Sequence, residues 1–365
     1  MKIGIIAHLK YPISRPFMGG LEAFTYDICQ RLLTRGHDVI LYACASSDPI
    51  LNVKPILCEE NYKPILSSKF TSRELSTEFI ATHHAYVEMM QEIDNDELDV
   101  IFNNSLNYVP IMMSGLVKAP MLTVLHTPPI FELKNAIRRE QQHGNVNYVS
   151  VSKSNAKNWE DYAPDCAVIH NGIDLSTWEF YPENEGGYIM WFGRIHPDKG
   201  LHLAIQASKT AGKKMKVAGA ISDQYYFEQV ITPLLDDSIE LVGHCDHTKL
   251  NELIGNATLS LITPCWDEPF GLVVAESLAC GTPVAGIGRG ALPDLLCDKT
   301  GALAAGEDIA ELAACIEQAS KLNRQDCRDR AEAHFDVELM IDQYEAALAE
   351  TAVKKSNFHQ RSNAA

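Results

Sequence analysis

Short runs of β-branched and other apolar residues alternate with helical patterns along almost the whole chain of 365 residues. This alternation is typical of parallel strands joined by crossover helices. The pattern therefore predicts an α/β fold built from doubly wound parallel sheets. The strands expected in the first part of the chain are residues 2–7, 39–43, 100–103, 121–125, 148–151 and 167–170. Those expected in the second part are residues 188–192, 215–218, 239–242, 259–262 and 284–287.

Three helical segments frame these strands. Apolar residues spaced three or four apart predict a helix over residues 21–35, which Gly36 ends. A second helix is expected at residues 71–93, and the chain from residue 308 to residue 350 is expected to be helical throughout.

A segment without periodicity separates the two groups of strands. Residues 171–187 are rich in Asn, Glu, Pro and Gly, which is a linker composition. At roughly 150 residues per domain, the length also favours two domains. Each would be a Rossmann-like sheet, and the two would face a central cleft at the carboxyl ends of their strands. We expect a first domain at 1–175, a linker at 176–187, a second domain at 188–335, a helix crossing back to the first domain at 336–352 and a polar tail at 353–365.

The charge balance argues against some partners. The chain has 31 Lys+Arg and 48 Asp+Glu, a net charge of −17, so nucleic-acid phosphates would be repelled by most of the surface. No run approaches the roughly 20 apolar residues that span a bilayer. We expect a cytoplasmic protein, at most peripheral at the inner membrane face. Lys134, Arg138 and Arg139 would then face either lipid or, more simply, solvent. The ten cysteines form no C-x-x-C pair, which is typical of free thiols in a reducing compartment.

One candidate binding motif follows the strand at residues 188–192. Gly193 and Arg194 come directly after it, and Lys199 lies five residues after the arginine. A planar guanidinium and a flexible ammonium at this spacing can converge on one anion, and a diphosphate suits such a pair. Two solvated cations at a strand end are the alternative interpretation.

A second motif begins with Glu268 and Pro269. Proline is favoured at the first helical position, so we expect a helix that opens at Glu268. Glu276 would lie about 12 Å further along the same helix, and two such carboxylates can accept hydrogen bonds from both ends of a glycosyl nucleotide. A dipole charge and a surface residue are the simpler interpretation, but Glu276 lies in an apolar run where a carboxylate needs a partner. The N–H groups expected to face a phosphate belong to Phe270, Gly271 and Leu272.

These motifs occur together with others in a recognisable order. They are Gly193-Arg194 with Lys199-Gly200, Glu268 to Glu276 as E-x7-E, and Gly281-Thr282-Pro283-Val284. Others are Met18-Gly19-Gly20-Leu21-Glu22, His126-Thr127-Pro128, Ser152 and Asn171-Gly172-Ile173-Asp174. Over almost its whole length the chain resembles the family 4 retaining glycosyltransferases of the GT-B fold, the glycosyl transferases group 1.

The resemblance implies that the first domain is on the acceptor side and that the second binds the nucleotide sugar, and it implies roles for the matching residues of the second domain. Arg194 and Lys199, beside Gly193, would neutralise the donor diphosphate, so that no divalent metal and no cofactor is required. Glu276 would bind the ribose hydroxyls of the nucleotide. Glu268 would hold hydroxyls of the transferred sugar near its anomeric carbon.

The resemblance also implies roles in the first domain. Gly19 and Gly20 would let the backbone approach the donor phosphate or the acceptor without an intervening side chain. His126 would hydrogen-bond the donor sugar. Two residues depart from the commonest family pattern: Pro269 replaces a glycine, and Asp294 stands where a glutamate is more usual. Both departures concern substrate detail, because neither removes a charge from the site.

The predicted reaction moves a hexosyl unit from a nucleoside diphosphate sugar to an acceptor hydroxyl with retention of configuration, in glycan, glycolipid or small-molecule glycoside synthesis. UDP-sugar is the favoured donor, with GDP-sugar or ADP-sugar as alternatives. The predicted catalytic residues are His126, Glu268, Arg194 and Lys199. The acceptor and the oligomeric state are beyond the sequence.

Three alternatives stay open. A nucleotide-sugar 2-epimerase and a non-catalytic nucleotide-sugar-binding protein would share the fold. A nicotinamide-dependent oxidoreductase would also have doubly wound sheets, although no G-x-G-x-x-G follows the first strand.

Overall fold

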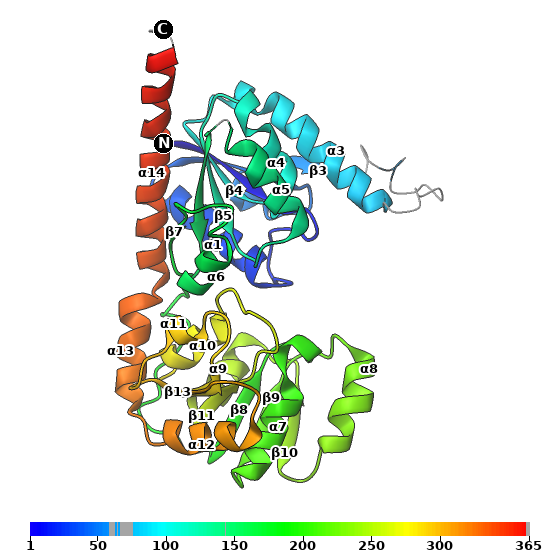
Figure 1. Ribbon diagram of the computed structural model, residues 1–365, viewed down its shortest axis with the longest axis vertical. Coiled ribbons are helices and arrows are strands. Elements are labelled where there is room, and N and C mark those ends of the chain that lie inside the picture. Colours follow the sequence, from blue (N-terminus) through cyan, green and yellow to red (C-terminus); the bar gives the residue numbers. More distant parts are fainter. Residues whose placement is uncertain (58–62, 64, 66–75, 143, 363–365) are drawn as a thin grey trace. The chain divides into compact units, whose positions relative to one another are not determined.

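The computed structural model describes residues 1–57, 63, 65, 76–142 and 144–362, with residues 354–362 described by their backbone alone. The chain divides into two compact units, each built around a parallel sheet (Figure 1). Unit 1 comprises residues 1–151, 156–169 and the chain from Ile341 onward. Unit 2 comprises residues 152–155 and 170–340.

Unit 1 contains one seven-stranded parallel sheet in the order β3-β2-β1-β4-β5-β6-β7. Ile3 of β1 lies opposite Val39 on one side and Val100 on the other, so β1 is the strand at which the order reverses. The strands are β1 (Lys2–Ala7), β2 (Asp38–Cys44), β3 (Val53–Leu57), β4 (Val100–Asn104), β5 (Met121–Leu125), β6 (Val146–Ser150) and β7 (Ala167–Val168). The helices are α1 (Gly20–Thr34), α3 (Thr77–Glu92), α4 (Tyr108–Met113), α5 (Phe131–Glu140), α6 (Lys153–Asn158) and α14 (Val337–Ser362), with α6 and α14 each shared with unit 2.

Unit 2 contains a six-stranded parallel sheet in the order β10-β9-β8-β11-β12-β13. Its strands are β8 (Tyr188–Phe192), β9 (Lys214–Ala218), β10 (Ile239–Gly243), β11 (Leu259–Ile262), β12 (Val284–Ile287) and β13 (Gly301–Ala304). Its helices are α7 (Leu201–Thr210), α8 (Gln224–Tyr226), α9 (His247–Gly255), α10 (Leu272–Ala279), α11 (Leu292–Leu295), α12 (Ile309–Ala319) and α13 (Arg324–His334). A continuous apolar core that includes Trp191, Leu201, Leu261 and Ile316 packs on this sheet.

Both sheets have a topological switch point, where ligands of such folds bind at the carboxyl ends of the strands. In unit 1 it lies between β1 and β4, which pair in parallel although a long stretch of chain separates them. In unit 2 it lies between β8 and β11. The loops after these four strands are therefore the places to look for functional residues.

The predicted two-sheet α/β fold is confirmed, with differences at individual elements. Two strands, β3 and β13, were not predicted. β3 carries Lys54 and Pro55 at a half-buried sheet edge, and β13 consists of a glycine, two alanines and a leucine, so neither shows a β-branched run. The strand expected at 167–170 has only the two residues of β7, and β6 begins two residues before the expected 148.

The helices also differ from prediction at their ends. α3 begins at Thr77, where the Ser76 hydroxyl accepts a hydrogen bond from the Phe79 N–H (3.0 Å). The earlier part of the expected helix, residues 71–75, lies outside the described residues. The segment 308–350 is not helical throughout, because breaks separate α12, α13 and α14. The expected polar tail is helical in its backbone as far as Ser362.

The expected linker, residues 176–187, contains no helix or strand but packs on unit 2. The Tyr181 N–H donates to the Cys280 carbonyl (3.1 Å), and the Arg324 guanidinium donates to the Tyr181 carbonyl (2.6 Å). Arg328 donates to the Trp178 carbonyl (2.9 Å). Residues 170–175, expected in the first domain, also belong to unit 2. The turn-rich composition thus marks a fixed irregular segment rather than a free connection.

Candidate functional site

Two loops of unit 2 meet at its switch point. One follows β8 and the other follows β11. The Cys265 N–H donates to the Asp198 carbonyl (2.8 Å), and the Thr263 hydroxyl donates to the Gly200 carbonyl (2.9 Å). Each loop therefore supports the other at the carboxyl end of the sheet, where side chains of both can reach the same ligand.

Lys199 and Glu268 form an ion pair between these loops. Lys199 Nζ contacts Glu268 Oε2, and the two side chains are 25% and 17% exposed. The Trp266 indole N–H donates to the same carboxylate oxygen (3.0 Å). The structure thus brings two predicted residues together and adds Trp266, which the sequence analysis did not single out. An aromatic residue with a polar N–H in the loop after a switch-point strand was the available signal.

Arg194 is not joined to this cluster. Its side chain is 58% exposed, and its Nη2 lies 3.5 Å from Asp198 Oδ2. None of the hydrogen bonds or ion pairs found among the described residues links Arg194 to Lys199 or Glu268. Its guanidinium can therefore reorient toward an anion at little cost, because an exposed pair at this distance contributes little.

The prediction that Glu268 and Glu276 share one helix is wrong. α10 begins at Leu272, after Gly271, whose φ of +88° is a left-handed conformation that a continuing right-handed helix does not allow. Pro269 is therefore in a loop and not at the first helical position. Glu268 is fixed instead through its backbone, because its carbonyl accepts the Ala291 N–H (2.9 Å).

Because α10 begins at Leu272, the N–H groups available to a phosphate differ from those predicted. Leu272 and the residue after it open the helix, so their N–H groups lie at the positive end of α10. Phe270 lies outside the helix, and its side chain, 3% exposed, packs on His170 and Phe335 in the core of unit 2. A small cavity of about 40 Å³ beside the cluster has Gly193, Lys199, Glu268 and Gly271 in its lining.

Glu276 is half-buried on α10 among apolar neighbours. None of the hydrogen bonds or ion pairs of the described residues involves its carboxylate. Burial raises the pKa of Glu276 to about 7. A carboxyl group in this state gains from any ligand that donates hydrogen bonds to it.

His126 follows β5 in unit 1, beside the end of β4. Its Nε2 lies 3.1 Å from Asn104 Oδ1, and its ring meets Phe24 edge-on at 4.7 Å between centroids. Burial, with a smaller contribution from His8, lowers the pKa of His126 to about 3. The imidazole is therefore neutral at physiological pH and can act only as a hydrogen-bonding group there.

Gly19 is the N-cap of α1, in extended conformation, and no side chain makes a capping hydrogen bond to this helix end. In the first turn of α1, Glu22 reaches His8, whose Nε2 lies 2.9 Å from Glu22 Oε1. Both side chains are buried, and burial lowers the pKa of His8 more than Glu22 raises it. No sequence motif predicted the pairing of His8 with Glu22. Their positions, after β1 and at the start of α1, were the available signal.

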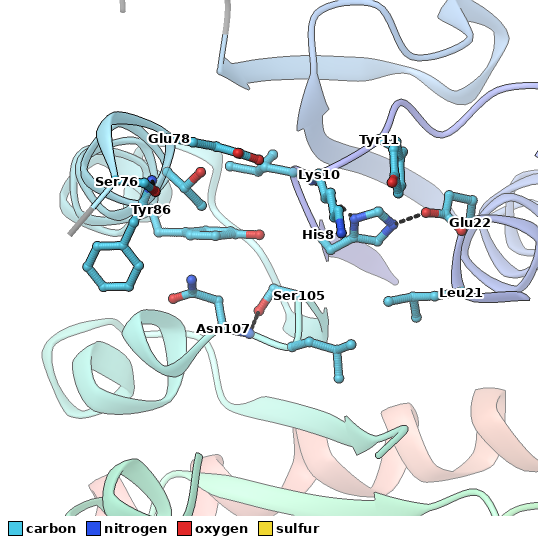
Figure 2. Close-up of a pocket in the computed structure, with 14 residues that line it drawn as sticks. His8, Lys10, Tyr11, Leu21, Glu22, Ser76, Glu78, Tyr86, Ser105 and Asn107 are labelled. Atoms are coloured by element: carbon cyan, nitrogen blue, oxygen red, sulfur yellow. Dashed lines mark hydrogen bonds and ion pairs between the residues drawn. The ribbon is translucent and has the colours of Figure 1, made fainter. Parts of the chain in front are cut away.

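A cavity of about 470 Å³ opens at the switch point of unit 1 (Figure 2). Lys10 and Tyr11 lie beside the His8–Glu22 pair, and Ser105 and Asn107 of the loop after β4 lie below it in the view. Leu106, between these two, has φ of +53°, a strained conformation for a residue with a side chain. The lining combines apolar and aromatic side chains with a few hydroxyl, amide and charged groups, which is typical of a small-molecule binding site.

The cations of α5 are partly engaged within unit 1. Lys134 Nζ lies 5.8 Å, and the Arg138 guanidinium carbon 4.7 Å, from the ring centroid of Tyr162. These are cation–π contacts of a solvated helix face, and a lipid-facing role for the patch stays a prediction. None of the helices in the described part of the chain combines the length and apolar character needed to cross a membrane. Within the same residues, no group of three His, Cys, Asp or Glu side chains is placed to hold a metal ion.

Two family models together match most of the chain. "Glycosyltransferase Family 4" matches residues 18–177, and "Glycosyl transferases group 1" matches residues 179–334. The chain belongs to the family 4, group 1 glycosyltransferases. A relative of this glycosyltransferase in Mycobacterium tuberculosis, a glycogen synthase, is 26% identical over an alignment that covers 87% of this chain and 88% of the relative.

Solved structures share its fold. Anabaena HepE, crystallised with UDP and glucose, has a TM-score of 0.71 at 19% identity and covers 96% of this chain and 100% of its own. A glycosyltransferase from Rickettsia africae has a TM-score of 0.74 at 16% identity, covering 96% and 98%. At these identities the likeness concerns the fold, which is GT-B: two Rossmann-like parallel-sheet domains.

Proposed function

We propose that this glycosyltransferase moves a hexosyl unit from a nucleoside diphosphate sugar to an acceptor hydroxyl, with retention of anomeric configuration and without a metal ion. The observation that carries the proposal is the cluster of Lys199, Glu268 and Trp266 at the switch point of unit 2. It combines a cation for a diphosphate with a carboxylate for sugar hydroxyls. UDP is the favoured nucleotide, and the binding of UDP and glucose by the HepE structure supports that choice. GDP-sugars and ADP-sugars are the alternatives.

In this proposal the donor spans unit 2. Lys199 and Arg194 bind the diphosphate beside Gly193, with the N–H groups at the start of α10 adding positive potential. Glu268 accepts hydrogen bonds from hydroxyls of the sugar. The half-buried Glu276 accepts them from the ribose, which gives its carboxyl group the partners that it lacks within the protein.

Unit 1 supplies the remaining groups. His126, neutral at physiological pH, hydrogen-bonds a hydroxyl of the donor sugar without adding a charge near the developing oxocarbenium ion. Gly19 and Gly20 add no side chain of their own at the N-terminus of α1, so the backbone there can approach a phosphate or the acceptor. The cavity beside His8 and Glu22 holds the acceptor.

The reaction breaks the bond between the anomeric carbon and the β-phosphate oxygen. The acceptor oxygen forms its bond to the same face of that carbon, and its proton passes to the departing phosphate oxygen. Negative charge grows on the diphosphate as the bond lengthens, so Lys199 and Arg194 bind the transition state more tightly than the donor. No carboxylate of the protein has to act as a nucleophile in this scheme.

A transferase is favoured over a 2-epimerase or a simple binding protein by one observation. The cavity of about 470 Å³ in unit 1 is large enough for a separate polar ligand, and only a transferase needs an acceptor. The test is a thermal-shift scan of UDP-, GDP- and ADP-sugars, followed by nucleotide release with a panel of sugar and polyol acceptors in EDTA. We expect release that depends on an acceptor and proceeds in EDTA, with the product anomer determined by NMR. Conversion of the donor without an acceptor would indicate an epimerase, and a strict Mn²⁺ requirement would contradict the mechanism.

A further inference from the structure

Trp266 contacts both charged residues of the cluster in unit 2. Its indole N–H donates to Glu268 Oε2 (3.0 Å), and Lys199 Nζ lies 5.6 Å from the centroid of the indole ring system. Lys199 also contacts the same carboxylate oxygen. Oε2 of Glu268 thus has two donors, the charged Lys199 ammonium and the neutral Trp266 indole N–H. Trp266 contacts both the carboxylate and the ammonium.

The other oxygen of Glu268, Oε1, takes part in none of the hydrogen bonds or ion pairs of the described residues. The carboxylate therefore presents one occupied and one available oxygen. A sugar hydroxyl can donate to Oε1 without displacing any protein group, whereas a diphosphate that draws Lys199 away takes one of the two donors from Oε2. The mostly buried Glu268 carboxylate then depends on its remaining donor, the Trp266 indole N–H, because a charge removed from water needs partners.

We propose that Trp266 is a positioning residue that retains Glu268 while Lys199 transfers from the carboxylate to the donor diphosphate. This inference rests on the proposed function of the site. The indole N–H stays on Oε2 after Lys199 leaves, so the carboxylate keeps its orientation and one partner during the exchange. The backbone around Trp266 supports this role, because the preceding residue, Cys265, donates its N–H to the carbonyl of Asp198 next to Lys199.

This role of Trp266 predicts different effects on the binding of two ligands. A nucleoside diphosphate removes Lys199 from Glu268 and offers no hydroxyl in return. A nucleoside diphosphate sugar removes Lys199 and supplies sugar hydroxyls to the carboxylate. Loss of the indole N–H therefore penalises the free nucleotide more than the sugar nucleotide.

The test replaces Trp266 by phenylalanine, which keeps an aromatic ring and removes the N–H. Calorimetry measures the dissociation constants of UDP and UDP-glucose, or of the GDP or ADP pair if the wild-type protein selects those. We expect the dissociation constant of the nucleotide to rise about tenfold and that of the sugar nucleotide about threefold or less, the loss of one hydrogen bond to a charged group. The turnover number should fall as well, because Glu268 is less well oriented.

Two further variants separate positioning from general damage. In a Lys199→Ala background there is no ion pair to exchange, so Trp266→Phe should change nucleotide affinity less than twofold. Trp178→Phe alters a buried tryptophan of the same unit whose ring lies tilted against His247, with 4.2 Å between the ring centroids, and which makes no contact with the cluster among the described residues. It should leave the ratio of the two dissociation constants unchanged.

The outcomes distinguish the inference from the proposed function. A wild-type protein that binds none of the nucleotides or their sugars overturns both. A wild-type protein that binds them, with Trp266→Phe weakening the two ligands equally or acting equally in the Lys199→Ala background, overturns the role of Trp266 alone.

Discussion

His126 Nε2 lies 3.1 Å from Asn104 Oδ1, so two residues at the ends of the neighbouring strands β5 and β4 are coupled through one contact. Asn104 is fully buried, and its side-chain nitrogen has no hydrogen-bond partner within the described residues. The amide is neutral and adds no full negative charge that would favour an imidazolium. Burial therefore controls the protonation of His126 and lowers its pKa to about 3.

We predict that Asn104→Asp raises the pKa of His126 by about 1–3 units, because a carboxylate at this distance favours the charged ring. NMR titration of the His126 ring protons measures the shift directly. The lowered pKa of His126 also makes the stability of the folded protein depend on pH. The wild-type ring stays neutral when folded but gains a proton near pH 6.5 when unfolded, so stability is lost as the pH falls from 6.5 toward 3.

The variant should lose less stability than the wild type as the pH falls from 7 toward 3, and the difference should approach about 1.4 kcal/mol for each unit of pKa restored once the pH is below the folded-state pKa of both proteins. Asn104→Ala, which removes the contact without adding charge, is the matched control. An unchanged His126 titration in the aspartate variant would contradict the coupling.

Glu276→Gln should stabilise the ligand-free protein at high pH while weakening nucleotide binding. Burial raises the pKa of Glu276 from 4.5 to about 7, so the folded protein holds this proton more tightly than the unfolded chain. The stability from this group is complete below pH 4.5 and is lost as the pH rises through 7.

The amide has no charge to desolvate. We expect a gain of about 1–3 kcal/mol at pH 8 and little change at pH 4. Urea unfolding at both pH values measures it. A gain of the same size at both would mean that the carboxyl group is not desolvated in the folded protein.

Gly290→Ala should disturb Glu268 specifically. An added Cβ would lie 2.4 Å from both the backbone nitrogen and oxygen of Glu268, and the φ of +60° is itself unfavourable for alanine. Gly212→Ala is the matched control, because Gly212 has a similar φ of +65° but a Cβ added to it would meet no other atom within 4 Å.

Both variants should lose about 1–2 kcal/mol of stability to the backbone conformation. Only Gly290→Ala should lose more than this and also lose about tenfold or more in turnover, because misplacement of a group by about 1 Å is costly in catalysis. Equal effects of the two variants on turnover would show that the contact with Glu268 does not matter.

Arg324→Met should be strongly destabilising, although Arg324 is remote from the charged cluster. The guanidinium is buried and donates to the carbonyls of Tyr181, Ala257 and Gly255 (2.6, 3.0 and 2.7 Å). Its removal leaves several buried acceptors without a donor, and we expect a loss of about 3–5 kcal/mol.

Lys213→Met, which breaks an exposed pair with Glu317, serves as the control and should change stability by less than about 0.5 kcal/mol. Thermal unfolding of the two variants provides the comparison. A small effect at Arg324 would mean that the segment 176–187 does not depend on this anchor.

The sequence predicted the fold well where its pattern is strong. The strands at 2–7, 121–125, 188–192, 259–262 and 284–287 lie at the predicted residues, since buried parallel strands are short apolar runs between turn signals. It failed at Gly301–Ala304, where small residues conceal a strand whose pairing with β12 is decided by tertiary structure.

Prediction of the site was limited in a similar way. The positions of Lys199 and Glu268 after strands of the second sheet predict that both belong to the site, and the structure pairs them. The contacts of Trp266 with Glu268 and of His8 with Glu22 join residues across loops or from a strand end to a helix, so no local pattern reveals them. The helix start at Leu272 was misjudged because Pro269 suits a first helical position, but the left-handed Gly271 intervenes.

Four residues from the middle of the chain, Ser152–Asn155, belong to unit 2 although the chain on both sides of them belongs to unit 1. The Ser152 hydroxyl donates to the Pro269 carbonyl (2.6 Å), and the Ser154 N–H donates to the Asp294 carboxylate (2.7 Å). A gene fragment that begins at residue 170 would therefore produce unit 2 without the donor that this segment supplies to Pro269, next to Glu268, and without the donor that it supplies to Asp294. Anyone who wishes to study nucleotide binding on a dissected half should graft this segment back, or keep the chain whole.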